Sequence, residues 1–228
     1  MARPFVYINM AMTADGKITS AAREYPRFTS DVDRRTMDRL RAEADAVLIG
    51  AGTLRADDPA MHVRDPGMQA YRRSLGKPDA LPNVVVTASA DLDPSSAFFR
   101  NGTPETRLVA TVDEAPRERV AAIETNAEVW RVGSDRVDLA RLLDRLRAER
   151  GVERLLVEGG GELNWQLLSR DLVDELFVTV APALLGGRDA PTLLEGEGFA
   201  MADHVRLRLA DIVREQDELF CRYEVVRG

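Results

Sequence analysis

The sequence predicts an α/β fold with one mixed, mostly parallel sheet, helices flanking it and an antiparallel hairpin at the C-terminal end. Short apolar segments alternate with amphipathic ones along most of the chain, which is typical of strands that alternate with helices. The last two segments, Arg206–Glu215 and Glu218–Val226, meet around Gln216-Asp217, and the second alternates apolar with polar residues, as a hairpin strand does. A chain of 228 residues can also bury a large core without disulfides.

Further strands are expected where short apolar runs are bounded by polar turns, glycines or proline. The first run ends in the polar turn Thr13-Ala14-Asp15-Gly16, and Pro182 ends the last one before the hairpin. In chain order, the expected strands are Phe5–Met12, Ala46–Gly50, Val84–Thr87, Arg107–Thr111, Glu128–Val132, Arg154–Glu158 and Glu175–Ala181.

The amphipathic segments between these runs are expected to form helices. Ser30 is a candidate N-cap with acidic residues in the following turn, and apolar residues recur at helical spacing as far as Ala44. Leucines form one apolar stripe within Asp138–Arg150, and Gly151 follows as a C-terminal stop. Helices are also expected at Pro116–Thr125 and between Gly161 and Leu168, whereas Asp58–Pro82 is expected to be irregular.

The composition excludes several classes of protein. Lys and Arg number 31 against 38 Asp and Glu, and the net charge of −7 argues against a general nucleic-acid binder, although local arginines and helix N-termini can still bind anions. One cysteine and two histidines predict neither an intrachain disulfide nor a metal site. The N-terminal apolar run lacks the features of a signal peptide, and no segment reaches the roughly 18 apolar residues of a membrane span. A cytoplasmic protein is expected.

Two glycine-rich junctions between a strand and a helix are the most informative features. The first is Gly50-Ala51-Gly52-Thr53, and the second is Gly159-Gly160-Gly161, which follows Glu158. Glycines there allow a phosphate to approach the backbone N–H groups at the start of a helix. The alternative is a tight turn that needs a positive φ. Neither junction completes a Rossmann or P-loop fingerprint, but two in one sheet favour a dinucleotide at the carboxyl ends of the strands.

Charged residues near these junctions are candidates for ligand contacts. Glu158 ends a buried strand, where a carboxylate needs a donor, so it either accepts a hydrogen bond from a substrate or forms an ion pair or helix cap. Asp57 is a candidate, although Asp57-Asp58-Pro59 also suits a plain turn at the end of a helix. Arg41, Arg55 and Arg64 could meet a substrate phosphate bidentately, or could be solvated surface residues.

Several unusual strings occur in a specific order over nearly the whole chain. They are TADGKI at 13–18, ADAVLIGAGTLRADDP at 44–59, VEGGG at 157–161 and APALLGG at 181–187. With them, the chain resembles the reductase domain of riboflavin biosynthesis, the C-terminal half of a bifunctional deaminase-reductase. The resemblance implies a dihydrofolate-reductase-like fold, NADPH as cofactor and a homodimer. No His-x-Glu or Pro-Cys-x-x-Cys motif of the zinc deaminase half occurs, so a single reductase domain over residues 1–228 is expected.

The resemblance also assigns roles to residues by position. It implies a cofactor-binding set of Met12, Thr53, Asp57, Thr87, Ser89, Gly159, Gly160, Gly161, Glu162, Leu163 and Asn164. It implies that the substrate is held by Arg41, Met61, Arg64 and Glu158. The candidate catalytic residues are Glu158, which would orient the substrate, and Asp57, which would position ligand groups. No side chain stands out as the proton donor, so water is the candidate.

The implied reaction converts the ribosylamino side chain of a pyrimidine 5′-phosphate to ribitylamino, with hydride delivered from NADPH to the sugar C1′. Two alternatives remain. One is a reductase of the same fold that acts on dihydrofolate or another pterin-like substrate, and Arg41 with Arg64 argues against it, since two arginines suit a phosphorylated sugar better than a glutamate tail. The other is a non-catalytic NADP-binding module.

Overall fold

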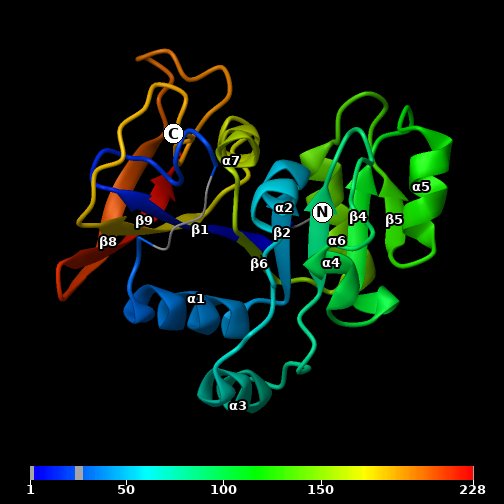
Figure 1. The fold of residues 1–228 in the computed structure, drawn as a ribbon, viewed down its shortest axis with the longest axis horizontal. Coiled ribbons are helices and arrows are strands. Elements are labelled where there is room, and N and C mark those ends of the chain that lie inside the picture. Colours follow the sequence, from blue (N-terminus) through cyan, green and yellow to red (C-terminus); the bar gives the residue numbers. More distant parts are fainter. Residues whose placement is uncertain (1–2, 24–27, 228) are drawn as a thin grey trace. The chain divides into compact units, whose positions relative to one another are not determined.

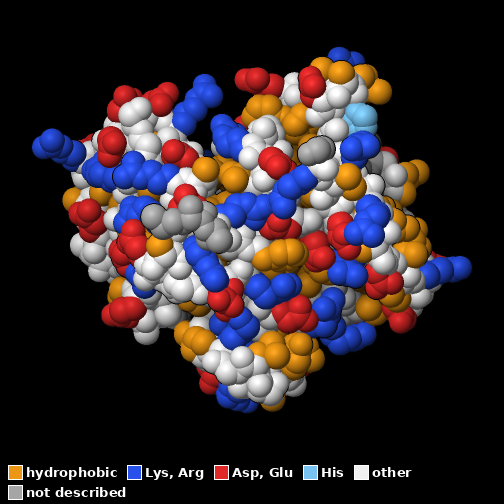
Figure 2. Space-filling model, turned by 180° about the vertical axis from the view of Figure 1, so that it is seen from behind, with side chains coloured by type: hydrophobic (Ala, Val, Ile, Leu, Met, Phe, Trp, Pro, Cys, Tyr) orange, Lys and Arg blue, Asp and Glu red, His pale blue; other side chains and the backbone are white. Residues whose placement is uncertain are grey.

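The structure is a computed structural model that describes residues 3–23 and 28–227. These residues divide into two compact units. The first unit comprises Met1–Phe5 and Arg41–Leu156, and the second comprises Val6–Leu40 and Val157–Gly228. Within the described ranges, no helix is both long and apolar enough to cross a membrane. Figure 2 shows basic and acidic side chains interspersed over one face of the molecule, in keeping with a modest net charge.

The first unit is built on strands in the order β5-β4-β3-β2-β6. Their bounds are β2 (Ala46–Gly50), β3 (Asn83–Val86), β4 (Arg107–Thr111), β5 (Glu128–Arg131) and β6 (Arg154–Val157). The pairs β2–β3, β3–β4 and β4–β5 are parallel, with Gly50 opposite Val86 and Val86 opposite Ala110. The strands therefore end together at one edge. The apolar, buried run of β2 is typical of a parallel strand that is covered on both faces.

Helices connect these strands and mostly follow the sequence signals. They are α2 (Ala51–Asp57), α3 (Pro66–Ser74), α4 (Ala97–Arg100), α5 (Arg117–Glu124) and α6 (Leu139–Arg150), with a 3₁₀ turn at Pro104–Thr106. In α6, Asp138 accepts the N–H of Arg141, and Gly151 at φ 65° ends the helix with its N–H on the Leu146 carbonyl. The predicted leucine stripe of α6 is buried.

The expectation that residues 58–82 are irregular is wrong in part, because α3 lies within them. Its N-terminus has an ordinary signal: Asp65 accepts the N–H of Met68, and Pro66 occupies the first helical turn. Arg72 on this helix is 1% exposed and donates to the carbonyls of Arg41, Ala42, Ala44 and Pro78. This guanidinium satisfies carbonyls where the chain leaves helix α1 (Asp31–Glu43) for β2, and its charge suits a helix C-terminus.

The second unit contains four strands in the order β1-β7-β9-β8. They are β1 (Phe5–Thr13), β7 (Glu175–Ala181), β8 (Arg206–Glu215) and β9 (Glu218–Val226), and only the first residue of β1 belongs to the first unit. β1 and β7 are parallel, whereas β9 is antiparallel to both β7 and β8. The predicted C-terminal hairpin is confirmed with its bounds unchanged. Together with the parallel strands, it confirms the predicted mixed α/β fold class.

Helices α1 and α7 (Gly161–Leu168) cover opposite faces of these strands (Figure 1). On one face, the Tyr7 hydroxyl donates to the Leu40 carbonyl of α1. On the other, Met10 packs against Gly159 just before α7. The alternation of residues along β1 therefore directs its side chains to both helices.

Candidate functional site

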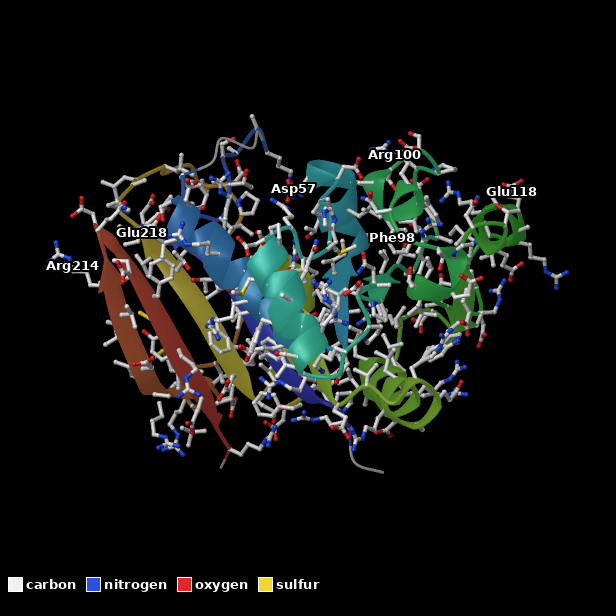
Figure 3. The ribbon with its side chains drawn as sticks, turned by 90° about the horizontal axis from the view of Figure 1, so that it is seen from below. Asp57, Phe98, Arg100, Glu118, Arg214 and Glu218 are labelled. Atoms are coloured by element: carbon white, nitrogen blue, oxygen red, sulfur yellow. The ribbon has the colours of Figure 1, made fainter. Side chains whose placement is uncertain are left out.

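In the first unit, Thr53 lies in the first turn of α2 and Thr87 directly after β3, while Asp57 and Ser89 follow them in the chain. β2 ends at Gly50, and α2 begins at the next residue. β3 ends opposite Gly50, and Thr87 follows directly. The glycine junction of β2 and the turn after β3 are thus neighbours at the carboxyl ends of parallel strands, where α/β sheets commonly bind ligands. Asp57 closes α2 and is exposed (Figure 3).

The turn after β3 is fixed by its own hydroxyl groups. Thr87 is buried, and its Oγ1 accepts the N–H of Ala90 at 3.1 Å. The exposed Ser89 accepts the N–H of Asp91 with its Oγ at 3.3 Å. Arg55 and Arg119 donate to the backbone carbonyls of this turn. Thr87 therefore supports the turn from inside, whereas the Ser89 hydroxyl faces solvent.

Gly52 in the first turn of α2 leaves space beside the backbone. It is exposed, its φ lies outside the left-handed region, and a Cβ built on it would meet no described atom within 4 Å. No packing contact or backbone conformation among the described residues requires a glycine there. The missing side chain instead leaves the backbone of the first junction open to a ligand.

The glycines of the second junction have packing reasons of their own. Gly159 adopts φ 85°, and its Cβ would lie 2.8 Å from the Met10 sulfur; its peptide bond to Gly160 is cis. A Cβ on Gly161 would lie 2.5 Å from the carbonyl oxygen of Thr192 and 2.7 Å from Cγ of Glu195. The alternative of a turn that requires glycine thus holds for Gly159, and close packing explains Gly161. Their predicted role in binding the cofactor stays a prediction.

Asn164 lies at the same junction with one polar atom unsatisfied. Its side chain is 1% exposed, and Nδ2 donates to the Leu193 carbonyl at 2.9 Å. Its Oδ1 is buried and has no hydrogen-bond partner among the described residues. Leaving an acceptor unpaired in the interior costs free energy, so Oδ1 is suited to a donor from a ligand. Met12 near the end of β1 and Glu158 directly before the glycines are half-buried.

The remaining residues of the second junction differ in exposure. Glu162 is exposed and accepts a hydrogen bond from Gln166, one helical turn on. Leu163 is buried, so its side chain belongs to the core, and only its backbone in the first turn of α7 is available to a ligand.

The predicted substrate residues of the first unit are not alike. Arg41 is 1% exposed, and its Nη1 donates to the carbonyls of Ala60 and His62 at 3.0 Å each. Met61, between these two residues, is 2% exposed. The predicted role of Arg41 and Met61 in holding the substrate stays a prediction. In the structure, the Arg41 guanidinium is bonded to the loop that leads to Arg64, whose side chain is exposed.

Sequence reasoning missed the role of Asp15. Its carboxylate accepts the N–H groups of Leu185 and Gly186, which are 170 and 171 residues away in the chain, and the Thr13 hydroxyl. The Thr13 hydroxyl, followed by the Gly186 and Leu185 N–H groups, lowers the pKa of Asp15 to about 2. The local sequence shows only a polar turn after a strand, and nothing in it points to so distant a partner.

Two acids in the second unit, Asp33 and Glu218, were also missed. Glu218 is 4% exposed and accepts the N–H and hydroxyl of Ser30, the predicted N-cap of α1. Burial raises the pKa of Asp33, and the Glu218 carboxylate adds to that shift, whereas hydrogen bonds from Thr179 and Thr29 oppose it. These contacts attach the start of α1 to β7 and β9.

Comparison with known proteins identifies the family. A family model described as the RibD C-terminal domain matches residues 4–219. The chain belongs to the RibD C-terminal domain family. The predicted family is therefore confirmed, and with it the predicted oxidoreductase class, because free-standing relatives of this RibD C-terminal domain are named as reductases.

Two of these relatives cover almost the whole chain. A protein of Archaeoglobus fulgidus is 42% identical over 197 residues, which are 86% of this chain and 89% of the relative. A protein of Methanothermobacter thermautotrophicus is 39% identical over 224 residues, 98% of this chain and 99% of the relative. Both are named 2,5-diamino-6-ribosylamino-4(3H)-pyrimidinone 5′-phosphate reductase.

A solved structure of Acinetobacter baumannii RibD supports the fold. It matches 98% of this chain with a TM-score of 0.81 at 24% identity, and the chain spans 58% of its length. At that identity the likeness shows the fold of the RibD C-terminal domain alone.

Proposed function

We propose that this chain is an NADPH-dependent reductase that converts the ribosylamino side chain of a pyrimidine 5′-phosphate to ribitylamino. The observation that carries the proposal is the 39% identity over 98% of the chain to a relative named 2,5-diamino-6-ribosylamino-4(3H)-pyrimidinone 5′-phosphate reductase. The names of both relatives specify a 2,5-diamino pyrimidinone, which supports the still-aminated pyrimidine as substrate. We further propose that residues 1–228 act as one reductase domain in the cytoplasm.

The residues present fit a dinucleotide. The unpaired Oδ1 of Asn164 suits a donor such as a carboxamide N–H or a ribose hydroxyl, and the open face at Gly52 allows close approach to the backbone. When bound, NADPH supplies the hydride. In the first unit, the residues that would contact it are Thr53, Asp57 and Ser89, with Thr87 as support. In the second unit, they are Met12, Gly160, Glu162 and Asn164, with Gly159, Gly161 and Leu163 as support through backbone and packing.

The chain's own contribution to catalysis is alignment and exclusion of water. Hydride addition at C1′ requires an opened sugar in which C1′ is an imine-like or carbonyl electrophile. We assign the orientation of this side chain to Glu158, which is half-buried and directly precedes the second glycine junction. Arg64, exposed after the loop that Arg41 fixes, would bind the 5′-phosphate. Water would supply the proton.

The direct test is oxidation of NADPH, followed at 340 nm, with the purified protein and the diaminopyrimidinone substrate. The proposal expects turnover with this compound and less with its deaminated counterpart or with dihydrofolate. Turnover with dihydrofolate alone would make the chain a pterin-like reductase. Tight NADPH binding with no turnover on any of them would make it a non-catalytic NADP-binding module. Parallel titrations with NADH test the choice of cofactor.

We also propose that the chain forms a homodimer through β8. This strand is the last of the second unit's strands and has a free edge among the described residues. Four of its apolar residues have exposed fractions of 43–51%: Leu207, Leu209, Ile212 and Val213. An exposed apolar edge strand promotes pairing with another chain. Sedimentation as a monomer at micromolar concentration would contradict this proposal, and Ile212→Lys should shift a dimer toward monomer.

A further inference from the structure

The segment 183–195, here called the strap, lies in the connection between β7 and the C-terminal hairpin and contains no helix or strand. Its first half is fastened to the turn after β1. The N–H of Ala14 donates to the Ala183 carbonyl at 2.9 Å, and the Asp15 carboxylate accepts the N–H groups of Leu185 and Gly186 at 3.2 and 2.6 Å. The two bonds to the Asp15 carboxylate are charge-assisted, a class of hydrogen bond about twice as strong as neutral ones.

The middle of the strap is fastened to the same turn by Lys17 and Ile18. The Nζ of Lys17 donates to the Ala190 carbonyl at 2.9 Å, and the N–H of Ile18 donates to the Pro191 carbonyl at 3.0 Å. Lys17 and Thr192 also form an isolated antiparallel bridge. The turn after β1 therefore holds the strap along most of its length.

The end of the strap lies on the N-terminal turn of α7. The N–H of Glu195 donates to the Gly161 carbonyl at 3.1 Å, and the Leu193 carbonyl accepts the Asn164 side chain. Thr192 and Glu195 occupy the space that a side chain on Gly161 would need. Just beyond the strap, Gly196 lies against the Trp165 ring, which its Cβ would approach to 2.4 Å. The strap thus fixes both the backbone and the side chains of the second glycine junction.

We propose that Asp15 is a positioning residue for the cofactor, which acts by holding the strap on the second glycine junction. This inference rests on the proposed function, which gives that junction and Met12 to NADPH. Asp15 follows β1 by two residues, and its carboxylate reaches the strap instead of the junction itself. Removing the Asp15 carboxylate leaves the two strap N–H groups without their acceptor. The strap then holds Asn164 and Gly161 less firmly, and NADPH binding weakens.

Two measurements on Asp15→Ala test the proposal, both in a Trp130→Phe background so that Trp165 is the remaining tryptophan. Calorimetry should show the Kd for NADPH rising by about tenfold, in line with the loss of two charge-assisted hydrogen bonds that act indirectly. Acrylamide should quench Trp165 more strongly in the ligand-free variant, because the strap no longer holds Gly196 against the ring. Asp15→Asn keeps one acceptor oxygen, so its Kd and its quenching should lie between those of Asp15→Ala and those of the protein that retains Asp15.

The matched control is Asp189→Ala, an exposed acid on the strap itself that makes no hydrogen bond or ion pair among the described residues. It should leave both readouts at their original values. Lys17→Met removes the hydrogen bond from the Lys17 side chain to the Ala190 carbonyl of the strap. It should likewise raise the Kd for NADPH and increase the quenching of Trp165. If Asp15→Ala does not fold, Asp15→Asn and Lys17→Met carry the same measurements.

The outcomes separate the proposal from its rivals. A higher Kd for NADPH with unchanged quenching would overturn the proposal, because the carboxylate would then act on the cofactor directly. Stronger quenching with an unchanged Kd would also overturn it, because the strap would not set affinity. If the unmodified protein binds no NADPH, the proposed cofactor falls and the positioning role with it, whereas the quenching still decides whether Asp15 holds the strap.

Discussion

The two glycine-rich junctions look alike in the sequence and differ in the structure. Each follows a buried strand and opens a helix, α2 in the first unit and α7 in the second. Gly52 of the first junction has an ordinary φ and open space beside it, whereas Gly159 has φ 85° and Gly161 is crowded by the strap. A glycine can thus serve a ligand or the packing of its own chain, and only distant contacts distinguish the two.

The largest effect that tests this comparison is expected from Gly161→Ala. Its Cβ would lie 2.5 Å from the Thr192 carbonyl oxygen, a backbone atom, so the strap must move. Overpacking of this kind lowers the free energy of unfolding by about 1–3 kcal/mol. Urea denaturation measures it, with Gly52→Ala as the matched control. Equal losses in the two variants would show that the junctions do not differ.

Glu158→Gln tests the second difference, since an acid directly precedes the glycines of the second junction and an isoleucine those of the first. We expect turnover to fall by about a hundredfold, the scale of a positioned acid or base, because the amide keeps the shape of the carboxylate but not its charge. NADPH affinity should stay nearly unchanged. Steady-state kinetics and calorimetry measure the two quantities. Glu197→Gln, an exposed acid beyond the strap, is the control. Equal losses of binding and turnover would contradict the orienting role.

Gly52→Ala should separate stability from cofactor binding at the first junction. An alanine in the open first turn of α2 leaves the free energy of unfolding unchanged or raises it by up to about 1 kcal/mol, because alanine favours a helix over glycine. The added methyl group should nevertheless raise the KM for NADPH by about tenfold, the equivalent of one lost contact. An unchanged KM would show that the open face is not used by the cofactor.

Local patterns predicted the elements that local physics determines. The hairpin bounds, Arg206–Glu215 and Glu218–Val226, follow from alternation and a polar turn, and the helix Leu139–Arg150 follows from its leucine stripe and caps. The helix Pro66–Ser74 was missed because the prolines of its surroundings outweighed the Asp65-Pro66 start signal.

The site was predicted less completely, because its details depend on partners far apart in the chain. Gly161 is crowded by Thr192, and Asp15 is bonded to residues 170 positions away. The Arg41 guanidinium is a group suited to binding phosphate, yet in the structure it is buried and donates to the carbonyls of Ala60 and His62. Residue type indicates which chemistry is available, whereas packing decides where each side chain points.

The smallest effect concerns the pH dependence of the second junction. The pKa of Asp15 is about 2 in the folded protein, held down by Thr13 and the strap N–H groups, against an ordinary value of 3.8. A carboxyl group with a lowered folded-state pKa adds stability above its unfolded pKa, and this stability is lost as the pH falls through the folded value. The stability that Asp15 contributes is therefore complete at neutral pH and declines as the pH falls from 3.8 to about 2.

Acid titration of stability measures this decline. In urea unfolding followed by tryptophan emission between pH 5 and about 2, Asp15→Asn should lose less stability than the unmodified chain over this range, because it has no carboxylate to protonate. The difference should be small, since Asp15 is exposed and its bonds compete with water. Asp189→Asn should follow the unmodified chain. Parallel curves for Asp15→Asn and the unmodified chain would mean that the Asp15 carboxylate does not hold the strap, and the second junction would then depend on packing at Gly161 alone.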